Sequence, residues 1–122
     1  MSKGFEDLEV WQKAKNLAVK FYVLSKSFPK EDQFGITSQM RRSSFSIPSN
    51  IAEGSAKSGD KEFLRYTSIA QGSCAEFKTQ LIIAKEIRIL PEKDFADCIL
   101  TVNDIGKMLK GLERRLKEKQ NK

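Results

Sequence analysis

The sequence predicts an all-α protein, an antiparallel up-down four-helix bundle whose second helix is kinked at a proline. Apolar residues recur at spacings of three and four along most of the chain. No segment alternates between apolar and polar residues as a half-buried strand would. Short polar stretches with glycine or proline separate four such segments. A chain of 122 residues fits a single domain, residues 1–122.

The helices are expected at about residues 5–27, 38–56, 60–90 and 92–118. Pro29 ends the first, and the stretch "KSGD" precedes the third, with Ser58 or Asp60 as its N-cap. Gly72 and Ser73 lie on or beside the inner face of the third helix, so another helix is expected to approach closely there. The fourth helix carries its apolar residues at heptad spacing, namely Phe95, Cys98, Val102, Ile105, Leu109, Leu112 and Leu116.

Pro48 interrupts the second helical segment. With Thr37 as N-cap, the core stripe of this helix consists of Ile36, Met40, Ser44, Ile47 and Ile51. Pro48 lies beside that stripe, where it cannot donate to the Ser44 carbonyl, at a cost of about 3 kcal/mol in a helix interior. A kink is therefore expected, with neighbouring serines bonding local backbone groups. The kink either only wraps the helix around its own bundle or also fits it to a neighbouring subunit.

The remaining faces of the second helix predict self-association. Opposite the core stripe lie Arg42, Ser46, Ser49 and Glu53, and on a flank beside Pro48 lie Arg41, Phe45 and Ala52. A phenylalanine away from the core favours a subunit contact, so a homo-oligomer is expected. The alternative is a solvated, ion-paired helix exterior.

The positive charge is concentrated at the C-terminus. The net charge is +6, and residues 107–122 hold seven basic and two acidic residues, a net of +5. A helix places Lys107, Lys110, Arg114 and Lys117 in one stripe that would face a polyanion. The candidate nucleic-acid-binding residues are therefore Lys107, Lys110, Arg114, Arg115, Lys117 and Lys119. The alternative is a solvated helix end whose cations complement the helix dipole.

The composition argues against catalysis and metal binding. The chain has no histidine, and its two cysteines, Cys74 and Cys98, lie in apolar helical patterns. Neither the common histidine-based nucleophile systems nor a four-ligand zinc site can be built. We expect buried free thiols, no metal, no cofactor and no enzyme activity. Without a membrane-spanning stretch or a signal peptide, we expect a soluble, cytoplasmic protein.

Three stretches, "DLEVWQKAKNLAVKFY", "FPKEDQFGITSQMRRSSFSIPSNIAEGSAKSG" and "FLRYTSIAQGSCAEFKTQL", resemble the bacterial proteins encoded by intervening sequences in 23S rRNA genes. "RRSSFSIPSNIAEG" is similar to the family signature RRAAxSIPxNIAEG, with Ser43 and Ser44 replacing two alanines. The residues that carry the resemblance, as signature and assembly candidates, are Arg41, Arg42, Phe45, Ser46, Pro48, Asn50, Glu53, Gly54, Gly72, Ser73 and Glu76. Glu76 is expected to pair with Arg41 or Arg42.

The resemblance implies an up-down four-helix bundle assembled as a homopentameric ring. It also implies kinship with the accessory variability proteins of diversity-generating retroelements, which bind nucleic acid and a reverse transcriptase. Two functions follow as hypotheses. One is a non-catalytic homo-oligomer that binds RNA or DNA through the basic stripe. The other is a scaffold for a protein partner such as a reverse transcriptase, without direct nucleic-acid binding.

Overall fold

The computed structural model describes residues 4–120, a part of the chain that contains four long helices and no strand. They are α1 (Glu9–Leu24), α2 (Ile36–Ala56), α3 (Asp60–Glu86) and α4 (Glu92–Gln120). Short 3-10 segments precede α1 and lead from it to α2, namely η1 (Gly4–Asp7), η2 (Ser25–Ser27) and η3 (Lys30–Asp32). The predicted all-α four-helix bundle is confirmed. Lys122, which contributes to the C-terminal charge, lies outside the described residues.

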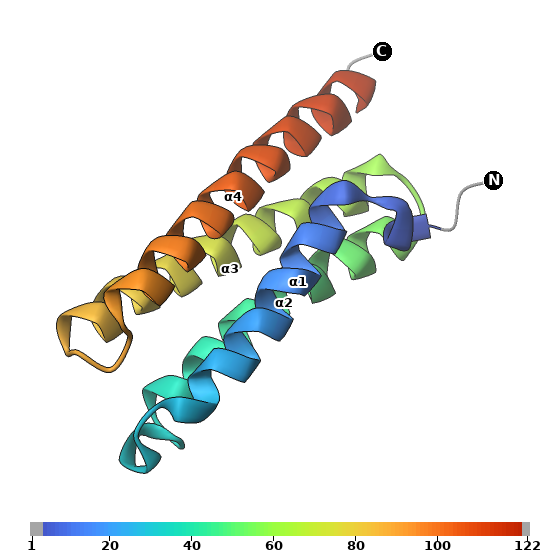
Figure 1. The fold of residues 1–122 in the computed structure, drawn as a ribbon. Coiled ribbons are helices and arrows are strands. Elements are labelled where there is room, and N and C mark those ends of the chain that lie inside the picture. The colour runs from blue at the N-terminus through green and yellow to red at the C-terminus, as the bar shows by residue number, and fades with distance from the viewer. Residues whose placement is uncertain (1–3, 121–122) are drawn as a thin grey trace.

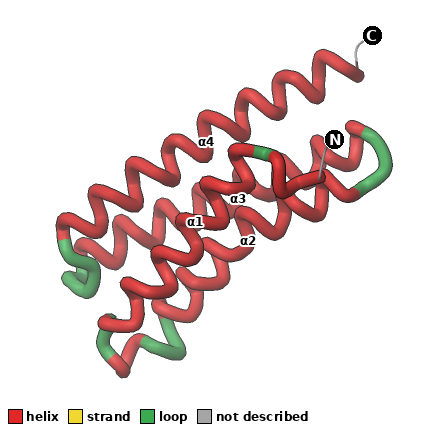
Figure 2. The backbone as a smooth tube through the Cα atoms, turned by 45° about the vertical axis from the view of Figure 1, so that its right-hand side comes forward, coloured by secondary structure: helices red, strands yellow, loops and turns green. Residues whose placement is uncertain are grey.

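The four helices surround one core. In Figure 1 each helix ends at the end of the bundle where the next one begins, and Figure 2 shows the longer loops at these two ends. α2 packs between α1 and α3, and α4 packs on α3 and α1. Phe21 of α1 and Phe77 of α3 meet edge to face across the centre, with ring centroids 5.1 Å apart. None of the helices within residues 4–120 is long and apolar enough to span a bilayer.

The core contains most of the residues that the helical spacing predicts. Met40, Ser44, Ile47 and Ile51 of α2 are fully buried, and so are the heptad positions of α4 from Cys98 to Leu109. Ile87 is an exception, with 53% of its surface exposed. The third helix ends at Glu86 and not near residue 90, because the chain turns at Arg88 (φ 68°) and the Ile89 and Leu90 amides bond to the Ala84 carbonyl.

The first predicted helix, residues 5–27, is divided into three parts. Leu8 has extended backbone angles (φ −76°, ψ 123°) and separates η1 from α1, and the last turn is the 3-10 segment η2. The Gln12 side chain donates to the Glu6 carbonyl, and the Phe5 ring packs edge to face on Trp11, 5.0 Å between centroids. These contacts attach η1 to α1 despite the break.

The predicted N-caps of the second and third helices are wrong. Gly35 occupies the N-cap position of α2, and Thr37 lies inside the helix and is buried. Gly59, with a φ of 93°, caps α3, whose first residue is Asp60. Neither cap makes a side-chain hydrogen bond. At Gly59 the positive φ favours glycine, a conformational requirement that the pattern of Ser, Thr and Asp did not reveal.

α2 continues as one helix through Pro48, which is buried. The kink itself stays a prediction. The Ser43 hydroxyl donates to the Met40 carbonyl and the Ser44 hydroxyl to the Arg41 carbonyl, at 3.1 and 2.9 Å. The expected bonding of these serines to local backbone groups is therefore confirmed, one turn before the carbonyl that Pro48 leaves without its usual donor.

Two helices approach closely at Gly54; of the predicted pair, Ser73 meets Ser46 of α2, but Gly72 meets no helix. A Cβ atom on Gly54 would lie 2.6 Å from Cβ of Tyr66 and 3.1 Å from the Phe63 ring, both on α3. A Cβ on Gly72 would meet nothing within 4 Å, and Gly72 is exposed. Only a glycine at residue 54 permits this contact between α2 and α3.

Gly54→Ala should lower the free energy of unfolding by about 1–3 kcal/mol, because the added methyl group overpacks the contact with Tyr66. The matched control is Gly106→Ala in α4, where a Cβ would meet nothing within 4 Å. The control should stabilise the protein by up to about 1 kcal/mol through helix propensity alone. Urea unfolding of both variants measures the difference, and equal stabilisation of the two would contradict the close contact.

Candidate nucleic-acid interface and assembly surfaces

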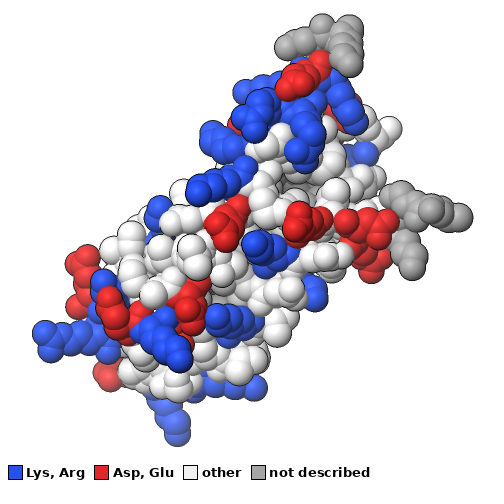
Figure 3. Space-filling view, turned by 45° about the horizontal axis from the view of Figure 1, so that its top comes forward, with Lys and Arg blue, Asp and Glu red and all other residues white. Residues whose placement is uncertain are grey.

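The basic end of α4 comprises Lys107, Lys110, Arg114, Arg115, Lys117 and Lys119. All six side chains are exposed, as a nucleic-acid interface requires. Figure 3 shows lysine and arginine side chains gathered at the end of the molecule where α4 ends. The structure thus brings the predicted cations to one end of the bundle.

Glu113 interrupts this row of cations. Its carboxylate lies 3.6 Å from Lys110 Nζ and 3.6 Å from Lys117 Nζ, and Gln71 of α3 donates to it at 3.5 Å. Desolvation raises the pKa of Glu113. The hydrogen bond from Gln71 and the charges of Lys117 and Lys110 together lower it by more, so the net shift of the pKa is downward. Two of the predicted cations are therefore partly neutralised within their own helix.

The positions of these residues in the sequence could have revealed this pairing. Glu113 follows Lys110 by three residues and precedes Lys117 by four, the spacings at which charged side chains meet on a helix. Lys107 and Arg114 are the stripe cations that make no ion pair among the described residues. The stripe contains two unpaired cations and two paired ones.

Arg114 and Arg115 lie close to Gly111, where the helix has no side chain. Their guanidinium nitrogens would lie 3.8 and 3.6 Å from a Cβ atom built on Gly111. Arg115 also lines a pocket of about 250 Å³ between the start of α1 and α4, together with Leu8 and Met108. Arg115 therefore faces α1, on a different side of α4 from the stripe.

Several signature residues meet where α2 packs on α3. The hydroxyls of Ser46 and Ser73, distant in sequence, lie 2.7 Å apart. The Asn50 side chain donates to the Ser46 carbonyl and hydroxyl at 2.8 and 2.9 Å. In the buried part of the same contact, the Ser43 hydroxyl shares its single hydrogen between the Met40 carbonyl and the Gln80 side-chain oxygen. These polar groups satisfy one another within the chain, which identifies them as helix-packing residues.

Glu53 and Gly54 extend this contact toward the end of α2. The Tyr66 hydroxyl donates to the Glu53 carboxylate at 3.3 Å, and the Tyr66 Cβ occupies the space beside Gly54. The Arg65 guanidinium lies 4.6 Å from the Tyr66 ring centroid. Glu53 is exposed, so its hydrogen bond sits at the surface of the α2–α3 contact.

Arg41 and Phe45 face α1 instead. Arg41 Nε donates to the Ser25 hydroxyl at 2.8 Å, and Arg41 Nη2 donates to the Tyr22 carbonyl at 3.3 Å. Its guanidinium carbon lies 4.4 Å from the Tyr22 ring centroid. Phe45 stacks on the same ring, with centroids 6.2 Å apart. The signature thus serves both neighbours of α2.

The expected pairing of Glu76 with Arg41 or Arg42 is wrong. Arg41 binds Ser25 and Tyr22 on the opposite side of α2, and no ion pair among the described residues joins Glu76 to either arginine. Both Glu76 and Arg42 are exposed. The partner of Arg41 could not be identified from the chain alone because its reach depends on how α1 and α2 pack.

An apolar groove runs between α1 and α2. It is lined by Lys15, Ala18, Val19, Tyr22, Val23 and Phe45, and has a volume of about 320 Å³. Val19 and Val23 are 56% and 58% exposed. Phe45 is 45% exposed, so stacking on Tyr22 covers only part of it. The expectation that Phe45 lies off the core is confirmed.

A second apolar surface lies on α3. It is formed by Ile69, Ile83 and Ile87, each more than two-fifths exposed. Glu76 lies at helical spacing from these residues, so the strip carries a negative charge among its apolar side chains. We call these four residues the α3 strip. The groove and the strip share no residue, since the groove is lined by α1 and α2 and the strip by α3 and the residue that follows it.

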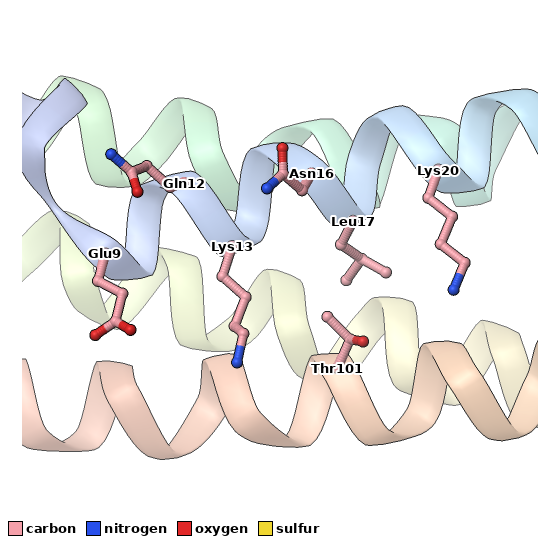
Figure 4. Close-up of a pocket in the computed structure, with 7 residues that line it drawn as sticks. All are labelled: Glu9, Gln12, Lys13, Asn16, Leu17, Lys20 and Thr101. Atoms are coloured by element: carbon pink, nitrogen blue, oxygen red, sulfur yellow. The ribbon is translucent and has the colours of Figure 1, made fainter.

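A groove of about 350 Å³ between α1 and α4 contains polar side chains but no reactive arrangement (Figure 4). Lys13 and Lys20 lie 3.7 Å from Asp104 and Asp97 of α4, respectively. The Thr101 hydroxyl donates to the Asp97 carbonyl at 3.1 Å. The two ion pairs join α1 to α4, and the Thr101 hydrogen bond lies within α4. The polar groups in this groove are therefore already bonded to one another.

Cys74 and Cys98 are free and buried, as predicted. Burial raises the pKa of Cys74 to about 12 and that of Cys98 to about 11. For Cys98, Lys20 lowers the pKa while Asp94 and Asp97 raise it. Thiolates are the reactive form, so neither cysteine has the character of a nucleophile. Within residues 4–120 no three His, Cys, Asp or Glu side chains are placed to hold a metal ion.

The same four-helix fold is found among solved structures. A protein of unknown function from the S23 ribosomal protein family of Bacteroides thetaiotaomicron matches with a TM-score of 0.80 and 22% identity. The match covers 85% of this chain and 97% of the other, and shows a shared fold. No curated protein matches the chain.

The model of the 23S rRNA-intervening sequence protein family matches residues 6–111. The chain therefore belongs to this family, and the resemblance seen in its signature is confirmed. The match includes the groove, the α3 strip and the α2–α3 contact. It ends before Arg114, Arg115, Lys117 and Lys119, so most of the basic end of α4 lies beyond the matched residues.

Both thiols should react slowly with an alkylating reagent in the native protein. At pH 8 a rise in pKa from 9.0 to about 11 for Cys98 lowers its thiolate fraction about 100-fold, and burial blocks access further. Alkylation followed by mass spectrometry, in buffer and in urea, measures the ratio of rates. Comparable rates in the two conditions would contradict the buried placement.

Proposed function

We propose that the protein is a non-catalytic, cytoplasmic homo-oligomer, a pentameric ring, that binds RNA through the basic end of α4. The observation that carries the proposal is the exposure of six cations toward one end of a single helix, of which Lys107 and Arg114 make no ion pair among residues 4–120. Phosphate groups attract such cations, and release of counterions makes the binding favourable. A ring repeats the basic surface once per subunit, which multiplies the contact.

Binding of this kind is directed at the RNA backbone. Tyr, Trp and Phe are absent from residues 107–122, so bases have no aromatic surface to stack on there. Phosphate contacts position a nucleic acid and carry little sequence information. We therefore expect little sequence preference, and duplex DNA serves as a comparator that tests the preference for RNA.

The apolar groove and the α3 strip support self-association. Lys15 of α1 lines the groove and Lys26 follows α1 in η2, whereas the α3 strip carries Glu76, and Glu86 directly precedes its last residue, Ile87. Both surfaces are largely apolar, and the charges at the groove are positive whereas those at the strip are negative, as on two sides of one interface. Because they are two different surfaces of the chain, contact between them is head to tail, which closes into a ring when the rotation permits.

A scaffold for a protein partner such as a reverse transcriptase is the second candidate function. The exposed apolar groove supports this scaffold function, since a partner protein would contact the same exposed side chains. Affinity purification from the native host with nuclease treatment separates the two functions. A stoichiometric protein that survives nuclease, with no RNA affinity in the purified protein, would favour the scaffold.

RNA affinity should fall when salt rises from about 50 to 200 mM, and Lys107→Gln with Arg114→Gln should weaken it further. Each lost cation reduces the slope of log affinity against log salt by about 0.7 for a single strand. Glu113→Gln should strengthen binding, because it releases Lys110 and Lys117. Filter binding or fluorescence anisotropy measures all three.

The matched control for these variants is Lys93→Gln, an exposed lysine at the other end of α4. It removes one positive charge, as Lys107→Gln and Arg114→Gln each do, and should leave the affinity nearly unchanged. Absence of binding at low salt, or an affinity that does not respond to salt, would refute RNA binding by this surface.

Val19→Asp and Ile83→Asp should each convert the oligomer to monomers, because each places a charge at the centre of one contact surface. A one-to-one mixture of the two variants should form dimers, since one chain keeps its α3 strip and the other keeps its groove. Sedimentation velocity measures the masses. Leu100→Asp, at an apolar position on α4 that is more exposed than Val19 or Ile83, is the control and should leave the oligomer intact. A mixture that stays monomeric would rule out the head-to-tail contact.

A further inference from the structure

A separate pocket lies where α1 leads into α2, at the end of the bundle opposite the C-terminal end of α4 (Figure 1). Its volume is about 290 Å³. Its lining combines three cations with hydroxyl groups and a short apolar wall, and consists of Tyr22, Ser25, Lys26, Phe28, Pro29, Lys30, Gln33, Thr37 and Arg41. We call it the end pocket.

The three cations of the end pocket lack an acidic partner. None of the ion pairs among the described residues includes Lys26, Lys30 or Arg41. Arg41 and Lys26 lie over the same Tyr22 ring, at 4.4 and 5.4 Å from its centroid. Glu31 and Asp32 belong to η3 but do not line the pocket. Like charges held together without a counter-charge favour binding of an anion.

The N-terminus of α2 adds uncompensated donors at this place. The N-cap Gly35 provides no side-chain hydrogen bond, and the first turn of the helix carries no acidic residue. The first backbone N–H groups of an α-helix have no partner within it, and they favour anions. α2 has 21 residues, long enough for its dipole to contribute.

Thr37 gives the observation that points to a ligand. It lines the end pocket, is only 2% exposed, and its Oγ1 has no hydrogen-bond partner among the described residues. A buried hydroxyl without a partner costs about 1–3 kcal/mol, and most such groups in folded proteins are satisfied. A bound acceptor would satisfy the Thr37 hydroxyl.

We propose that the end pocket binds the phosphate group of a small phosphate monoester. The phosphate accepts hydrogen bonds from the Thr37 hydroxyl and from the first amides of α2, and Lys26, Lys30 and Arg41 neutralise its charge. Arg41 is held by Ser25 and Tyr22 through two of its five N–H donors, so its orientation is fixed before binding. Phe28 and Pro29 provide an apolar wall for the carbon part of the ester.

Titration of the ¹⁵N-labelled full-length protein with glycerol 3-phosphate and inorganic phosphate tests the proposal. Saturable shifts are expected for the amide signals of Ile36, Thr37 and Ser38, with weaker binding of acetate. Thr37→Val should lower the affinity for phosphate about tenfold, the effect of one hydrogen bond to a charged group. The same variant should raise the melting temperature of the ligand-free protein, because it removes the unpartnered hydroxyl. Lys30→Gln should weaken binding about threefold.

Thr67→Val is the matched control, because Thr67 is equally buried but its hydroxyl already donates to the Phe63 carbonyl at 2.8 Å. It should leave phosphate affinity unchanged and should not raise the melting temperature. The proposal is overturned if Ile36, Thr37 and Ser38 show no saturable shift, if Thr37→Val binds phosphate like the unaltered protein, or if acetate binds as tightly as phosphate.

Discussion

The contact between α2 and α3 is the constraint on which the rest of the molecule depends. Gly54 lets the two helices approach so closely that a single added carbon would lie 2.6 Å from Tyr66. The Ser46–Ser73 and Ser43–Gln80 hydrogen bonds pair polar groups along the same contact. Small side chains that pack closely and hydrogen-bond to one another hold the two helices in one relative position. This contact therefore fixes the direction in which the remaining faces of α2 point.

The opposite side of α2 is fixed by a different kind of interaction. Arg41 binds Ser25 and stacks on Tyr22, and Phe45 covers the other part of that ring. One continuous signature thus packs α2 against α3 with serine, asparagine and glycine, and against α1 with arginine and phenylalanine. The groove beside Phe45 and the end pocket beside Arg41 are both consequences of this packing, which connects the signature to two surfaces that a ligand or a second chain can reach.

The charge at the end of α4 is organised more finely than its net value shows. Glu113 holds Lys110 and Lys117, and Gln71 of α3 fixes the carboxylate. Arg115 faces α1, while Lys107 and Arg114 are exposed and make no ion pair among the described residues. The family match ends at residue 111, whereas α4 continues to Gln120. The fold is therefore shared with the family, and the outer part of the basic end lies on the portion of α4 that follows the matched residues.

The sequence by itself determined the helical class, the core stripes of α2 and α4, the burial of both cysteines and the family, because periodic burial and a specific signature are local properties of the chain. Only the tertiary structure showed that Gly54 and not Gly72 marks the close approach, that Arg41 binds α1 and not Glu76, and that Thr37 is a buried helix residue and not a cap. Each of these depends on which helices become neighbours and at what distance. Spacing along one helix says which side chains share a face, but the packing of the helices decides what that face meets.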